Sequence, residues 1–226
     1  MTLTKILSLS RGFLDDNALP YSWSNDELVE DLNKSINELC EKAELLLDST
    51  TEAICKITIT KDLAKYALDE RIINIKRARL ITYDKRITKR TAQYMDRYYN
   101  GWDMATAGSG TPTCFLEDIN TGYIHLVPTP DANDVLWLTV SRLPLLAMDI
   151  ATPDASPEIK SRYHFELLDG ILWRAYSKQD TETYDPKKAA NHFGLWQATL
   201  NTRMLEIINR NDIDNAEDQI PDYLDD

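Results

Sequence analysis

The chain has 226 residues, with 25 Lys and Arg against 37 Asp and Glu, so its formal charge at neutral pH is −12. Hydrophobic residues make up 43% and charged residues 27%, which is typical of a globular chain and far from the composition of disordered ones. The excess of carboxylates argues against general coating of nucleic acid, because carboxylates repel phosphate. No apolar run reaches the roughly 20 residues that a bilayer requires, so no membrane partner is expected.

The first predicted helix opens on a capping box, in which Ser24 is followed by Glu27. Apolar residues then recur at spacings of three and four, which predicts a helix over about 24–46. Beyond it, alternation with a period of two indicates strands, and two of them flank a hairpin-length connection at 118–122. These patterns predict an antiparallel β region over about 52–143.

Two helix starts of the same form follow, because Ser156 and Asp185 each precede a proline. They predict helices over about 157–178 and 186–209, which pair as a helical hairpin. The second carries an apolar stripe made by Ala189, Phe193, Trp196, Leu200, Met204 and Ile207. Periodicity then ends, and residues 211–226 are interpreted as an acidic, extended tail.

The predicted fold class is therefore α+β. We expect residues 1–210 to form one domain, a helical bundle of the first helix and the C-terminal hairpin with the antiparallel β region inserted into it. The tail of residues 211–226 lies outside that domain.

Charge is distributed unevenly along the chain. Residues 71–90 carry eight basic groups and one acid, whereas residues 206–226 carry eight acids and one Arg. Blocks of one sign suggest partner surfaces. The basic block is open to three interpretations: cover for a strand edge, contact with an acidic partner surface, and contact with nucleic acid. Its candidate contact residues are Lys76, Arg77, Arg79, Lys85, Arg86, Lys89 and Arg90. In the tail, the candidate anchors on a partner are Ile220, Tyr223 and Leu224.

Motifs for catalysis are missing from the sequence, which has no phosphate loop, dinucleotide fingerprint, zinc-protease helix or nucleophile elbow. His125, His164 and His192 have no metal-ligand spacing, and the acid pair Glu117–Asp118 arises readily by chance among 37 acids. Three scattered cysteines indicate neither a disulfide framework nor a zinc site. No catalytic, cofactor or metal site is predicted.

Four segments carry a resemblance to a known family: Ser22–Leu28, Tyr66–Ile73, Pro157–His164 and, most specifically, Leu172–Ala189. They resemble the head-to-tail adaptor, or connector, proteins of tailed bacteriophages, over most of residues 20–205. The resemblance implies a structural protein of the virion neck, assembled in the host cytoplasm. It implies a homo-oligomeric ring, typically of twelve copies, under the portal protein and above a tail or nozzle protein, with double-stranded DNA passing through without sequence specificity. Under this resemblance, the acidic partner of the basic block is an adjacent subunit or the portal, and the nucleic acid is DNA in the channel. The tail anchors would then bind a subunit or the portal.

No active-site residue carries over from that family, so an enzyme is not expected. Two other functions stay open at this point: a virion-associated hydrolase that cleaves peptidoglycan, and a small nucleic-acid or regulatory binding protein.

Overall fold

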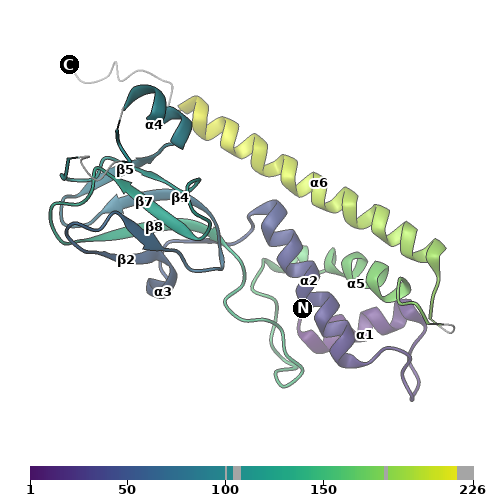
Figure 1. Cartoon of the computed structure of the whole chain (residues 1–226). Coiled ribbons are helices and arrows are strands. Elements are labelled where there is room, and N and C mark those ends of the chain that lie inside the picture. The colour runs from purple at the N-terminus through teal and green to yellow at the C-terminus, as the bar shows by residue number, and fades with distance from the viewer. Residues whose placement is uncertain (100, 104–107, 181–182, 218–226) are drawn as a thin grey trace. The chain divides into compact units, whose positions relative to one another are not determined.

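The computed structural model describes residues 1–99, 101–103, 108–180 and 183–217, with side chains up to residue 209. The chain divides into two compact units. Residues 1–46 and 144–226 form the helical unit, and residues 47–143, inserted between them in sequence, form the sheet unit (Figure 1).

The described part of the helical unit contains four α-helices and one 3₁₀ turn. These are α1 (Leu3–Leu14), α2 (Asn25–Ala43), the turn Ser161–Tyr163, α5 (Leu167–Tyr176) and α6 (Pro186–Glu217). The predicted capping box is present at the start of α2, where Ser24 Oγ accepts from the Glu27 N–H and the Glu27 carboxylate accepts from the Ser24 N–H. The predicted start of α6 is also confirmed, since Asp185 Oδ1 accepts from the Lys188 N–H at 3.0 Å.

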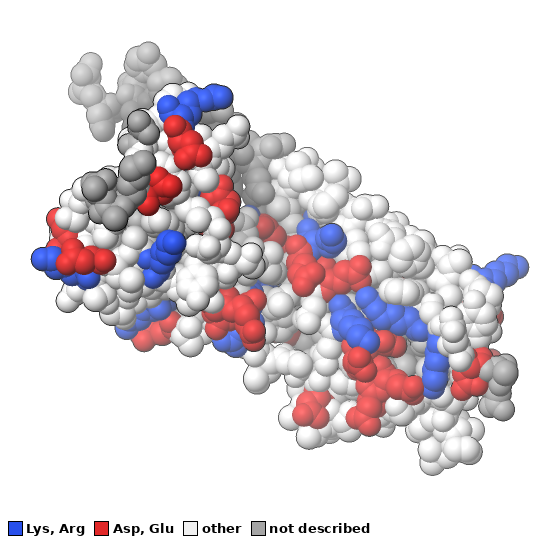
Figure 2. Space-filling model, viewed as in Figure 1, with Lys and Arg blue, Asp and Glu red and all other residues white. Residues whose placement is uncertain are grey.

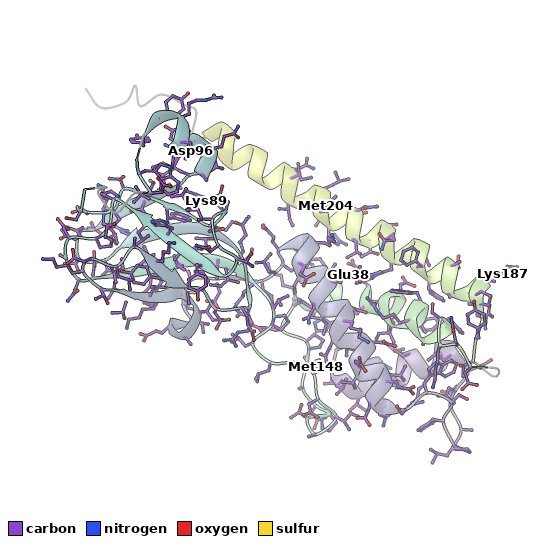
Figure 3. The ribbon with its side chains drawn as sticks, viewed as in Figure 1. Glu38, Lys89, Asp96, Met148, Lys187 and Met204 are labelled. Carbon is purple, nitrogen blue, oxygen red and sulfur yellow. The ribbon has the colours of Figure 1, made fainter. Side chains whose placement is uncertain are left out.

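Helices α2, α5 and α6 pack against one another through a buried apolar core (Figure 1). Trp196 of α6 is fully buried, and its Nε1 donates to Glu38 Oε2 of α2 at 2.9 Å. Arg174 of α5 donates to the same carboxylate at 2.8 Å, so one acid joins the three helices (Figure 3). Gly170 permits the close approach of α5, because a Cβ there would lie 2.5 Å from Ser35 Oγ.

Three helices of the helical unit, α1, α5 and α6, differ from prediction. Helix α1 was not predicted, although Leu3, Ile6 and Leu14 are buried on one side of it. The helix expected from residue 157 begins at Leu167, because the Ile159 carbonyl is bonded to the His164 ring, at 2.8 Å, instead of continuing a helix. Helix α6 runs to Glu217, through the start of the segment predicted to be extended, since each added residue gains a hydrogen bond once a helix exists.

The sheet unit holds eight strands and two short helices among its described residues. They are β1 (Leu47–Asp48), α3 (Glu52–Cys55), β2 (Lys56–Ile59), β3 (Lys65–Ala67), β4 (Ile72–Leu80), β5 (Lys85–Lys89), α4 (Ala92–Tyr98), β6 (Cys114–Leu116), β7 (Tyr123–Val127) and β8 (Asp134–Arg142). The strand order is β1-β8-β4-β5-β6-β7-β3, and β2 also pairs with β8, in line with β1.

The predicted fold class was wrong in its architecture. The β region is not an antiparallel insertion in a helical bundle, because its eight strands form a large curled sheet with a core of its own (Figure 1). The sheet is also mixed, since β5 and β6 pair in parallel through Thr88↔Cys114 and Lys89↔Phe115. The hairpin of β6 and β7 is antiparallel, as its turn residues predicted.

The chain enters the sheet unit at Leu47 and leaves it at Leu143, at the same corner of the sheet. There β1 pairs antiparallel with the end of β8, through Leu47↔Ser141. A buried ion pair fastens this corner, with Arg142 Nε donating to Asp48 Oδ2 at 2.7 Å. Burial alone would raise the pKa of Asp48, but hydrogen bonds from Thr51, Thr50 and Arg142 hold it well below its usual range.

Candidate interaction surface

The seven candidate residues of the basic block lie on β4, β5 and the residue after β5. Strand register decides which of their side chains share a face. Arg79 of β4 is directly opposite Arg86 of β5, and Arg77 lies two residues before Arg79 on the same side. All three are exposed, whereas Ala78, Leu80 and Ile87 between them are buried on the opposite side. The alternation of β4 and β5 therefore directs three arginines outward from the sheet.

The same face continues across the neighbouring strands. Arg79 pairs in register with Trp137 of β8, and Trp137 in turn pairs with Lys56 of β2. The half-buried Trp137 donates its indole N–H to the Ser49 carbonyl at 2.7 Å. We call the surface made by Lys56, Arg77, Arg79, Arg86 and Trp137 the cationic face.

Neutralisation of the cationic face within the chain is incomplete. Arg79 is paired with Asp84, and Lys56 with Glu52 at 3.3 Å. Arg77 and Arg86 have no ion-pair partner among the residues that the structure describes. Like charges directly opposite each other destabilise a sheet, so the Arg79–Arg86 pair is locally unfavourable.

The other predicted basic residues lie off this face. Lys76 lies at an irregularity of β4 and is half-buried, and Lys85 is exposed on the opposite side of β5. Lys89 is paired with Glu117 at 2.7 Å and also donates to Asn74 (Figure 3). Arg90 stacks over the Tyr94 ring, 4.6 Å from its centroid.

The strand-edge interpretation does not fit the arginines of β4. That strand is paired with β5 on one side and β8 on the other, so Arg77 and Arg79 do not lie on an edge strand. The interpretation fits only the first residues of β5, because β6 pairs with Thr88 and Lys89 alone. Sequence reasoning also missed Lys56 and Trp137, although both stand at outward positions of predicted strands.

The histidines weighed for catalysis have separate structural environments. His164 is buried and bonded to the Ile159 carbonyl, whereas His192 contacts Asp169 at 2.8 Å. His125 belongs to the sheet unit, where burial lowers its pKa.

The acid pair Glu117–Asp118 has two separate structural contacts. Glu117 pairs with Lys89, and Asp118 accepts the Ala92 N–H at the start of α4.

A family model described as "SU10 adaptor protein" matches residues 1–223. The chain belongs to this family. Its members are head-to-tail adaptors of phages, so this adaptor is a structural component of a virion, as the resemblance implied. No curated protein matches the chain. Among the residues that the structure describes, the adaptor has no helix of sufficient length and apolarity to span a bilayer.

The two units of the adaptor differ sharply in charge. The sheet unit has 13 basic and 12 acidic residues, for a formal charge of +1, whereas the helical unit has 12 basic and 25 acidic residues, for −13. The adaptor thus carries its negative excess in one unit and its cationic face on the other. The predicted tail anchors Ile220, Tyr223 and Leu224 lie outside the described residues.

Proposed function

We propose that this adaptor joins head to tail in a phage particle as one subunit of a ring beneath the portal. The observation that carries the proposal is the family match over residues 1–223 of a 226-residue chain. The ring has twelve copies, binds the portal above and a tail or nozzle protein below, and surrounds DNA that passes without sequence specificity. It is added at the neck during assembly in the host cytoplasm.

The surface of α6 supports a place between subunits. No Asp, Glu, Lys or Arg occurs from Ala189 to Thr202, and Figure 2 shows α6 largely white while charged side chains gather over α2. Phe193, Leu195 and Leu205 on this helix are each more than 40% exposed. In a unit of charge −13, a stretch of helix without Asp, Glu, Lys or Arg lets copies approach without strong repulsion.

Passage of DNA agrees with the overall charge. A net charge of −12 repels phosphate, so a ring of these subunits holds DNA weakly and lets it slide. A hydrolase would instead need converging catalytic groups, whereas His164, His192 and Glu117 each have a structural contact of their own.

Native mass spectrometry of the purified adaptor with the portal protein of the same phage tests the proposal. We expect portal complexes that carry twelve adaptor copies, and no attachment to the portal of a phage with a different neck. The proposal fails if the adaptor never joins its own portal, or if the isolated chain releases soluble fragments from purified peptidoglycan.

A further inference from the structure

The cationic face has the composition of a protein-binding surface. Arginine and tryptophan are enriched in protein interfaces, and here Trp137 stands in register between Arg79 and Lys56. The unfavourable opposition of Arg79 and Arg86 is relieved by any partner that brings carboxylates to both. An array of exposed, partly unneutralised arginines around an indole therefore fits an acidic polypeptide with apolar side chains.

The chain itself contains such a polypeptide. Residues 206–226 hold eight acids and one Arg, a formal charge of −7, which is the highest density of negative charge in the sequence. Among these acids stand Ile213, Ile220, Tyr223 and Leu224. Both requirements of the cationic face, negative charge and apolar anchors, are met by this one segment, which we call the acidic segment.

We infer that the cationic face of one adaptor copy binds the acidic segment of a second copy. The inference rests on the proposed ring and names the partner surfaces of its subunit contact. A contact between two different surfaces of identical subunits propagates from copy to copy, which is the arrangement that closes into a ring. Opposite charges also steer the two surfaces together.

Duplex DNA is the less favoured partner of the cationic face. The rest of the chain repels phosphate, since the helical unit alone carries −13. Phosphate groups also offer nothing apolar to Trp137 or to the half-buried Val135 beside it on β8. The acidic segment satisfies both the arginines and these apolar side chains.

Binding of a labelled peptide tests the contact apart from ring formation. The peptide comprises residues 206–226 with a fluorescent label, and its partner is the full chain carrying Asp218→Asn, Asp222→Asn, Asp225→Asn and Asp226→Asn, so that its own segment competes less. Fluorescence anisotropy then gives Kd in low salt. Replacing Arg77, Arg79 and Arg86 together by Gln should raise Kd by about tenfold or more, as expected for three exposed charge contacts.

A matched control removes three exposed positive charges from the helical unit, by Lys5→Gln, Lys160→Gln and Lys187→Gln. This control should leave Kd within about twofold of the parent, and a peptide with the residues of 206–226 in scrambled order should bind more weakly. The inference is overturned if the control weakens binding as much as the arginine variant. It is also overturned if a 20-base-pair duplex binds with dependence on the three arginines while the peptide does not.

Cross-linking identifies which copy supplies the acidic segment. Equal amounts of isotopically light and heavy full-length chain are mixed and treated with a carbodiimide, which joins a lysine to a carboxylate. We expect mixed light–heavy links from Lys56, the lysine of the cationic face, to the carboxylates of residues 212–226. Links found only within one copy would overturn the second-copy assignment. Because neither assay involves the portal, failure here is distinguishable from failure of the adaptor to join its portal.

Discussion

Replacing Arg142 by Met should destabilise the sheet unit strongly, because it leaves the Asp48 carboxylate buried without its cation. The two side chains are only 7% and 4% exposed, and their contact is 2.7 Å long. Asp48 keeps hydrogen bonds from the backbone N–H groups of Thr50 and Thr51, at 2.8 and 3.0 Å. Those remaining donors satisfy part of the carboxylate but supply no net charge.

Loss of one partner of a buried ion pair costs about 3–5 kcal/mol, and the remaining donors to Asp48 place this variant near the lower end, about 3 kcal/mol. Since small domains are stable by only about 5–15 kcal/mol, the change is easily measured by urea denaturation at pH 7. The double variant Arg142→Met with Asp48→Asn should lose less than the sum of the single losses, because it leaves no charge unpaired.

The pH dependence gives a second measure of the same contact. The folded pKa of Asp48 lies below its ordinary value of 3.8, so its stabilisation is complete above that value and is lost as the pH falls through the folded pKa. The wild type should therefore lose its advantage over Arg142→Met as the solution is acidified. A variant within about 0.5 kcal/mol of wild type at pH 7 would refute the reasoning, since surface substitutions have effects of that size.

Two further substitutions test the helical unit. Gly170→Ala should cost about 1–3 kcal/mol, because the new Cβ would lie 2.5 Å from Ser35 Oγ. Gly194→Ala, where a Cβ meets nothing within 4 Å, should be neutral or stabilising by up to about 1 kcal/mol. Equal urea midpoints for the two variants would contradict the close approach of Gly170 to Ser35. Burial raises the pKa of Asp31 to about 6, above its unfolded value of 3.8, so ionised Asp31 destabilises the fold at pH 7. Asp31→Asn should therefore stabilise the chain by about 1–2 kcal/mol at pH 7 and much less at pH 4; an equal effect at both values would refute this.

Elements with local signals were predictable from the sequence. The start of α2 follows from Ser24 and Glu27, and the start of α6 from Asp185 before Pro186, because a cap acts within one helical turn. The signal at Ser156 failed because the residues that follow it form hydrogen bonds outside a helical turn. Glu158 accepts the Leu145 N–H at 2.9 Å, and His164 bonds to the Ile159 carbonyl.

Sheet architecture depended on contacts that no local pattern contains. The parallel pairing of β5 with β6 joins Thr88 to Cys114, residues separated by a helix and a long connection. Without knowledge of that pairing, the alternation of apolar and polar residues predicts a simple antiparallel meander. The cationic face was only partly predictable for the same reason, since the charge run revealed the arginines but only register joins them to Trp137 and Lys56.

The fastened corner where β1 meets the end of β8 makes the sheet unit an exchangeable module. Its first and last strands run side by side, so Leu47 and Ser141, next to its two ends, are about one strand spacing apart, roughly 5 Å. A segment whose ends meet in this way can be replaced by a short loop or by an unrelated domain without stretching the chain that flanks it. The helical unit could thus be retained while the inserted module is exchanged, which offers a physical route for one adaptor framework to acquire new partner surfaces.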